Sequence, residues 1–276
     1  MRIYVTSDVH VDHWAQEYEG SAVLETPEKR RAFYEKHILG KFLPADACII
    51  AGDIANDSVN QIEFLKFISE RYDDVYVVHG NHDLTVNEYE HLYVTSEKRM
   101  DAVQNVFKDT NVHILDTSGC NGIYGTMGFC DFSIMSKPFG THHTPFYRWK
   151  KWYDGFMWNY MEQHPKRIRQ HYARELTKIC KMKPKIVVTH YVPIQFGIPF
   201  DYRNSSSNTF FYFDGKKYLD MLPDGAIWVC GHTHTRKQMI YTNASGAHIN
   251  IMCNAIGYPF DGIYSEFIPN DFVVTL

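Results

Sequence analysis

The chain has 276 residues, 45% of them hydrophobic and 22% charged, which excludes an intrinsically disordered protein and provides for a sizeable core. No stretch approaches the roughly 20 consecutive apolar residues of a transmembrane helix, so we expect no membrane span. The formal net charge of −4 excludes a general attraction for nucleic acid or an anionic membrane, and any such binding would need a local basic patch.

The six cysteines are scattered without a Cys-x-x-Cys pair, and Cys48 and Cys230 lie in apolar runs typical of buried strands. This pattern indicates reduced thiols in a core. Met1 to Val5 leads straight into a strand pattern with no apolar signal segment. We therefore expect a cytoplasmic protein.

Short apolar runs alternate with helical patterns along the chain, which predicts a layered α/β fold in a single domain spanning residues 1–276. Runs rich in Val and Ile that end in Gly, Asp, Asn or His are typical of buried strands. The predicted strands are 3–6, 47–51, 75–79, 112–115, 186–189, 227–230 and 249–253, and the C-terminal part adds 238–242 and 265–268. The predicted helices are 28–39, 60–71, 96–108 and 166–181.

Residues 132–185 differ in composition from the rest, and we predict that they form a cap inserted into the main domain. Residues 148–185 contain eleven Lys or Arg and three Asp or Glu, a net charge of +8. Eight aromatic residues lie between 146 and 160. The aromatic rings could pack a helical cap, which the pattern favours, or could stack on the bases of single-stranded nucleic acid.

Five predicted strands end in residues that commonly bind metals: Asp8-Val9-His10, Gly52-Asp53, Gly80-Asn81-His82-Asp83, His190, and Gly231-His232-Thr233-His234. The carboxyl ends of the strands of an open α/β sheet face one crevice, so these residues can converge. Imidazole, carboxylate and amide ligands together suit Mn, Fe or Zn, whereas Mg and Ca favour oxygen alone. Seven candidate ligands suit two ions if one carboxylate bridges them, and Asp53 is the natural bridge.

The five blocks, in this order, resemble the signature of the calcineurin-like metallophosphoesterase superfamily, and they span residues 8–234. The resemblance implies a sandwich of two central mixed β-sheets flanked by helices. It also implies a phosphoester substrate and two divalent metal ions. A hydroxide bridging the ions would attack phosphorus in line.

The resemblance further implies a role for each matching residue. One metal would be bound by Asp8, His10 and His234, and the other by Asn81, His190 and His232, with Asp53 between them. Asn81 and His82 would contact the substrate, and His82 would donate a proton to the leaving oxygen. In the protein phosphatases of the superfamily an Asp orients this histidine, whereas this sequence has Asn56 at that position. His13 matches no motif position, so we expect a surface or core role for it.

Three functions are compatible with these residues. The main hypothesis is a binuclear phosphoesterase acting on a phosphodiester or a phosphomonoester. The first alternative is a nuclease that binds single-stranded nucleic acid through the basic, aromatic insertion. The second is a protein-interaction scaffold of the same fold without catalysis, which would be expected to have lost some motif residues.

Overall fold

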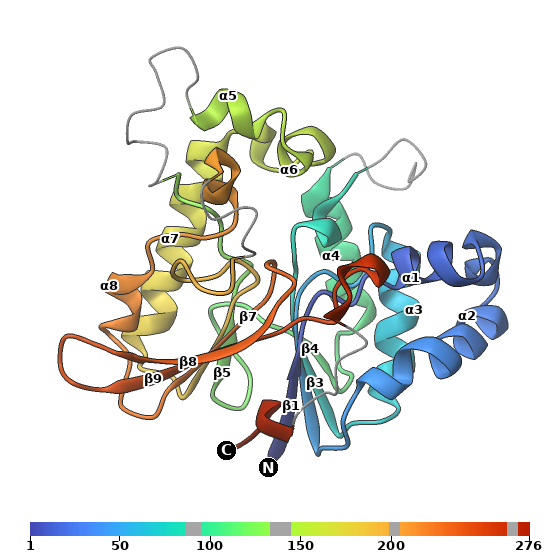
Figure 1. Cartoon of the computed structure of the whole chain (residues 1–276), viewed down its shortest axis with the longest axis horizontal. Coiled ribbons are helices and arrows are strands. Elements are labelled where there is room, and N and C mark those ends of the chain that lie inside the picture. The colour runs from blue at the N-terminus through green and yellow to red at the C-terminus, as the bar shows by residue number, and fades with distance from the viewer. Residues whose placement is uncertain (87–94, 133–144, 199–204, 264–269) are drawn as a thin grey trace.

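Two five-stranded sheets lie against each other at the centre of the protein (Figure 1). Their strand orders are β10–β1–β2–β3–β4 and β5–β6–β7–β9–β8, and neighbouring strands are parallel except for β10 with β1 and β8 with β9. The computed structural model describes every residue except 87–94, 133–144, 199–204 and 264–269. The strands of the first sheet are β1 (Arg2–Thr6), β2 (Ala47–Ala51), β3 (Asp74–Val78), β4 (Val112–Ile114) and β10 (Val273–Thr275). Those of the second are β5 (Ile123–Gly125), β6 (Ile186–Val188), β7 (Ile227–Cys230), β8 (Arg236–Thr242) and β9 (His248–Asn254).

Strand β1 shows why these runs become buried strands. Ile3 and Val5 point between the two sheets, where they pack in one cluster with Val188 and Val229 of the second sheet. Tyr4 points to the opposite face and packs under the helices. Both faces of the strand are thus covered, which explains its continuous apolar run.

Helices cover the outer faces of the sheets (Figure 1). The first sheet is covered by α1 (Val11–Tyr18), α2 (Pro27–Phe33), α3 (Ser58–Ser69) and α4 (Ser96–Val106). The second is covered by α7 (Pro165–Lys181) and α8 (Lys216–Leu219), while α5 (Pro145–Trp149) and α6 (Tyr153–Met157) lie beyond the carboxyl ends of the strands. The starts of two helices follow from their caps: the Thr26 hydroxyl accepts a hydrogen bond from the Lys29 amide, and the Asp57 carboxylate accepts one from the Asn60 amide.

The predicted α/β sandwich is confirmed, and most elements lie within two residues of their predicted bounds. The helix predicted at 28–39 is shorter, because α2 ends at Phe33 and a π-helical turn covers Tyr34–Ile38. The predicted elements do not include α1, α8, β5 or β10, because α8, β5 and β10 have only three or four residues each and α1 begins directly after a candidate metal-binding motif. The strand predicted at 265–268 lies outside the described residues.

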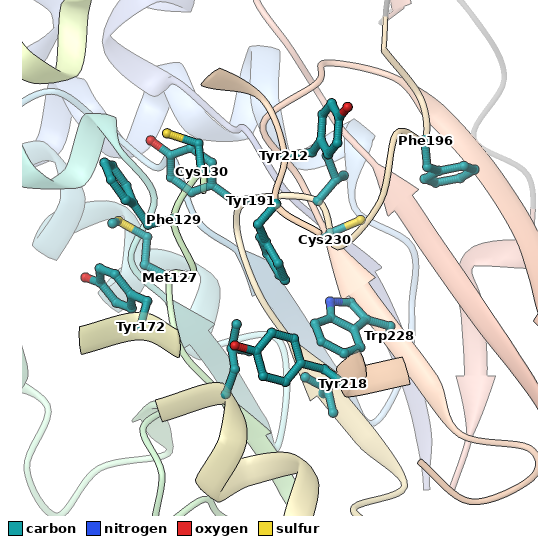
Figure 2. Close-up of a cluster of buried hydrophobic side chains, with 14 of the residues drawn as sticks. Met127, Phe129, Cys130, Tyr172, Tyr191, Phe196, Tyr212, Tyr218, Trp228 and Cys230 are labelled. Carbon is teal, nitrogen blue, oxygen red and sulfur yellow. The ribbon is translucent and has the colours of Figure 1, made fainter. Parts of the chain in front are cut away.

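The described part of the predicted cap packs closely on the second sheet. On α7 the buried side chains Ile168, Tyr172 and Leu176 join the cluster that contains Trp228 of β7, and Figure 2 shows Tyr172 and Trp228 within it. The basic side chains of α7 lie mainly on the opposite, exposed side. The helix therefore forms an outer layer of the sandwich, and the limits of a cap at 132–185 stay a prediction. Among the described helices, none is long and apolar enough to cross a bilayer.

Candidate metal centre

The candidate metal ligands follow the carboxyl ends of β1, β2, β3, β6 and β7, so the two sheets bring them to one place. Five of them have left-handed backbone: Asp8, His10, Asp53, His232 and His234, with φ between 45° and 68°. Such angles are uncommon for residues other than glycine and require support from the surrounding structure. Strained backbone of this kind concentrates at functional sites.

Asp83 supplies part of that support. Its buried carboxylate accepts hydrogen bonds from four backbone amides, those of Asp53, Ile54, Ala55 and Gly80. These amides belong to the loops that follow β2 and β3, so one side chain ties the two loops together. Gly80 is required here because a Cβ atom at this position would lie 2.1 Å from Asp53 Oδ1. The sequence motif contains Asp83, but sequence alone did not indicate this role.

The first group of potential ligands consists of Asp8, His10, Asp53 and His234. His10 Nε2 lies 3.1 Å from His234 Nε2 and 3.7 Å from Asp53 Oδ2, and His234 Nε2 lies 3.5 Å from Asp8 Oδ1. Donors bound to one ion at about 2.1 Å are themselves about 3.0 to 3.4 Å apart. The spacing therefore fits a shared metal ion.

The second group shares Asp53 with the first. Asp53 Oδ2 lies 3.3 Å from His190 Nε2, and His232 belongs to the same group of ligand atoms. Asn81 Oδ1 lies 2.8 Å from His190 Nε2. The other oxygen of Asp53, Oδ1, accepts a hydrogen bond from the His82 amide, which fixes the carboxylate between the two groups.

Three of the four histidines in these groups have one ring nitrogen within hydrogen-bonding distance of an oxygen away from the other ligands. His190 Nδ1 lies 2.8 Å from the Ala51 carbonyl oxygen, His232 Nε2 3.1 Å from the Phe210 carbonyl oxygen, and His234 Nδ1 2.6 Å from Asp261 Oδ2. An imidazole that donates from one nitrogen presents the lone pair of the other to a metal, and this arrangement is typical of histidine ligands. Asp261 was not predicted from the sequence.

The electrostatics of the two ligand groups also fit a cation. Burial, followed by the neighbouring imidazoles, lowers the pKa of His10 well below its usual value, so its ring is neutral and able to bind a metal. Burial also lowers the pKa of His190, but Asp53 outweighs it and raises that pKa to about 10 in the metal-free protein. A bound metal ion would displace this proton.

His82 adjoins the two groups above and forms a third group of potential ligand atoms with His10 and His13. Its Nδ1 is 2.7 Å from Asn56 Oδ1, and its Nε2 is 3.1 Å from the Tyr258 hydroxyl. Burial and the surrounding histidines lower the pKa of His82 well below its usual value. The structure thus places Asn56 where it orients the imidazole, as its position in the sequence suggested, and Asn56 Nδ2 in turn donates to Asp12 Oδ2 at 2.7 Å.

Two further ring side chains, His13 and Tyr258, lie beside His82 and His10. The His13 ring lies 6.2 Å from that of His82 and 4.5 Å from that of Tyr258, and the Tyr258 ring lies 4.4 Å from that of His10. His13 is therefore at the site, contrary to the role expected from the motif. The spacing from His10 is a signal that could have found it, since residues three apart share one face of a helical turn.

The insertion also contributes side chains to the site. The Tyr153 ring stacks on His82 at 4.5 Å, and its hydroxyl donates to Asn56 Oδ1. Asp154 accepts from Asn81 Nδ2 at 2.9 Å, and Trp158 Nε1 donates to the Asn81 carbonyl oxygen at 2.8 Å. Burial raises the pKa of Asp154 to about 7, and nearby divalent cations would lower it again.

Two mixed sheets that gather His and Asp side chains at their strand ends are the architecture of a protein that can bind metal ions. The model of the calcineurin-like phosphoesterase family matches residues 1–236, and the chain belongs to that family. It is accordingly a metal-dependent phosphoric ester hydrolase.

Among solved structures, a phosphopantetheinyl hydrolase from Mycobacterium tuberculosis has the same fold, with a TM-score of 0.67 and 16% sequence identity. The match covers 98% of this chain and 94% of the other. No curated protein matches the sequence significantly.

Proposed function

We propose that the chain hydrolyses a small phosphodiester or phosphomonoester with two divalent metal ions, of which Mn, Fe or Zn best suit the ligands. The observation that carries the proposal is one oxygen atom, Asp53 Oδ2, which lies 3.7 Å from His10 Nε2 and 3.3 Å from His190 Nε2. A carboxylate placed between two sets of donors is suited to bridge two ions. The proposed ligands are Asp8, His10 and His234 for one ion, Asn81, His190 and His232 for the other, and Asp53 for both.

Ions bound at these positions would polarise the phosphoryl oxygens and acidify a shared water for in-line attack on phosphorus. The protein's own part is to hold the phosphoryl group with Asn81 and His82. Because Nδ1 of His82 is engaged by Asn56, its Nε2 faces the substrate. The Tyr258 hydroxyl, 3.1 Å from this nitrogen, marks where a substrate oxygen could bind.

His82 also has the position of a general acid for the leaving group. Its pKa is low in the metal-free protein, but a bound phosphoryl anion raises the pKa of an adjacent imidazole. Protonation of His82 would therefore accompany substrate binding. The proton would pass from Nε2 to the leaving oxygen as the P–O bond breaks.

The test is hydrolysis of bis-p-nitrophenyl phosphate and of p-nitrophenyl phosphate by metal-stripped protein supplied with Mn, Zn, Ni, Co or Mg. We expect turnover that depends on added metal and falls at least about 1000-fold in Asp53→Asn, since both ions lose their shared ligand. Preference for one ester assigns the diester or the monoester activity. Equal turnover by Asp53→Asn and the parent protein would contradict the proposal.

A nuclease is a second candidate, because α7 presents exposed basic side chains to solvent, among them Lys166, Arg167 and Arg174. The aromatic residues of the insertion favour it less, since Trp149 and Trp158 are buried and cannot stack on bases. The discriminating measurement is salt dependence. If several phosphate contacts hold single-stranded DNA, its rate of cleavage should fall by orders of magnitude between about 50 and 200 mM salt. The rate of hydrolysis of a small ester should change little over the same interval.

A further inference from the structure

Asn81 differs from the other proposed ligands because its side chain has two unlike ends. The carbonyl oxygen can bind a metal, whereas the amide nitrogen carries two hydrogens and cannot. Rotating the amide by half a turn would replace the ligand with a donor. Something must therefore fix which end faces the metal position.

Asp154 is placed to fix it. Its Oδ1 lies 2.9 Å from Asn81 Nδ2, and the oxygen of the same amide lies 2.8 Å from His190 Nε2. An ionised carboxylate, the form that nearby divalent cations would favour for Asp154, only accepts hydrogen bonds, so the nitrogen end of Asn81 must point to Asp154. The oxygen end is then directed to the ligand group of His190.

Asp154 is itself held rigidly. The Tyr191 hydroxyl donates to its other oxygen at 2.7 Å, and Asp154 is fully buried. Figure 2 shows Tyr191 among the buried aromatic and sulfur-containing side chains of the second sheet, where Phe129 is a close neighbour with ring centres 5.7 Å apart. The orientation of Asn81 is thus fixed, through Asp154 and Tyr191, by the packing of the protein core.

The backbone around Asp154 makes the same connection. Gly155 of α6 packs against the end of α5 so closely that a Cβ atom at this position would lie 2.1 Å from the Trp149 carbonyl oxygen. Trp158, three residues after Gly155, is buried, and its Nε1 donates a hydrogen bond to the main-chain carbonyl oxygen of Asn81. The insertion therefore holds Asn81 by its main chain and by its side chain.

We propose that Asp154 is a positioning residue that sets the amide orientation of Asn81 and thereby the affinity of the metal position formed with His190 and His232. This inference rests on the proposed function for the identity of the ligands. It assigns the segment around α6 a specific task, which is to build one half of the metal centre.

The test is a titration of metal-stripped protein with Mn²⁺ alone. Calorimetry and electron paramagnetic resonance measure how many ions bind and how tightly. The parent protein should bind two Mn²⁺. Asp154→Leu should bind one with unchanged affinity and the second about 10- to 100-fold more weakly, the usual cost of removing a group that orients a ligand. The unchanged first site shows that the variant is folded.

Three further variants decide the matter if Asp154→Leu does not fold. Asn81→Asp places two carboxylates side by side and should weaken the second Mn²⁺. The double variant Asn81→Asp with Asp154→Asn should restore the affinity for the second Mn²⁺, because the amide introduced at position 154 can donate to the new carboxylate. Tyr191→Phe keeps the Asn81 contact and should change the affinity only a few-fold.

Loss of the second Mn²⁺ without recovery in the exchanged pair would overturn the inference, as would two tight sites in Asp154→Leu or fewer than two sites in the parent protein. These outcomes are independent of turnover. Parent protein that binds two Mn²⁺ and hydrolyses neither ester would refute the proposed function while the positioning role of Asp154 stands.

Discussion

On the α6 side of the candidate centre, Asp154 and Trp158 are fully or almost fully buried and hydrogen-bond to Asn81. On the α1 side, Asp12, His13 and Asn56 are half-buried and line an open cavity of about 460 Å³. The α6 side is linked to the core of the second sheet, whereas the α1 side faces solvent. We infer a division of tasks: the α6 side fixes Asn81, and the α1 side, where His13 lines this cavity and lies 6.2 Å from His82, leaves room for the substrate.

His82 lies where the two sides meet and gives the largest expected effect on catalysis among changes that leave the proposed metal ligands in place. His82→Ala should lower kcat by about 10²- to 10⁴-fold, the range for loss of a general acid, because no other group donates to the leaving oxygen in the proposed mechanism. Mn²⁺ stoichiometry, measured on the same samples, should not change. Full activity in this variant would remove His82 from the mechanism.

Trp158 tests whether the α6 side is rigid. Trp158→Phe removes a buried indole donor and leaves the Asn81 carbonyl oxygen short of a partner, so we expect a loss of about 2 kcal/mol in the free energy of unfolding. Urea denaturation measures this. The control is Phe156→Ala in α6, two residues before Trp158, where the ring is 76% exposed and the change should stay within about 0.5 kcal/mol. Equal losses in the two variants would argue against a rigid α6 side.

His13 tests whether the α1 side serves substrate binding rather than stability. His13→Ala should raise KM for the preferred ester about 3- to 10-fold, as expected for one lost polar contact, with little effect on stability. Steady-state kinetics and urea denaturation separate the two quantities. A fall in stability comparable with that of Trp158→Phe would show that the α1 side is as structural as the α6 side.

Lys41 gives the smallest expected effect and depends on pH. Its ammonium group lies 4.0 Å from the centre of the Trp14 ring on α1, and burial, followed by the charge of Arg236, lowers the pKa of Lys41 to about 8. The folded protein therefore binds fewer protons than the unfolded chain between pH 8 and about 10.5, and stability rises across that interval.

Below pH 8 the cost of burying the charge is fully present. Lys41→Met should thus be more stable than the parent protein at pH 7 by about 1 kcal/mol, allowing for solvent screening of a half-buried group. The difference should shrink as the pH approaches 10. Urea denaturation at both pH values checks this, and a difference that does not depend on pH would contradict the lowered pKa.

The sequence by itself determined the sandwich, the family and the set of candidate ligands. Apolar runs such as those around Ile3 and Ile49 are local signals, because a strand covered on both faces needs apolar side chains at successive positions. The ligand motifs are also local, since each one follows the end of its own strand. The sequence therefore indicated Asp8, Asp53 and His190 without knowledge of their mutual distances.

Tertiary structure decided which side chains support that set. Asp154 lies 73 residues from Asn81 along the chain, and the hydrogen bond between them exists because α6 packs over the ends of the strands. The place of Tyr258 beside His82 depends in the same way on distant packing. No short-range pattern records such contacts, because a hydrogen bond between distant residues depends on how whole layers pack rather than on neighbouring residues in the chain.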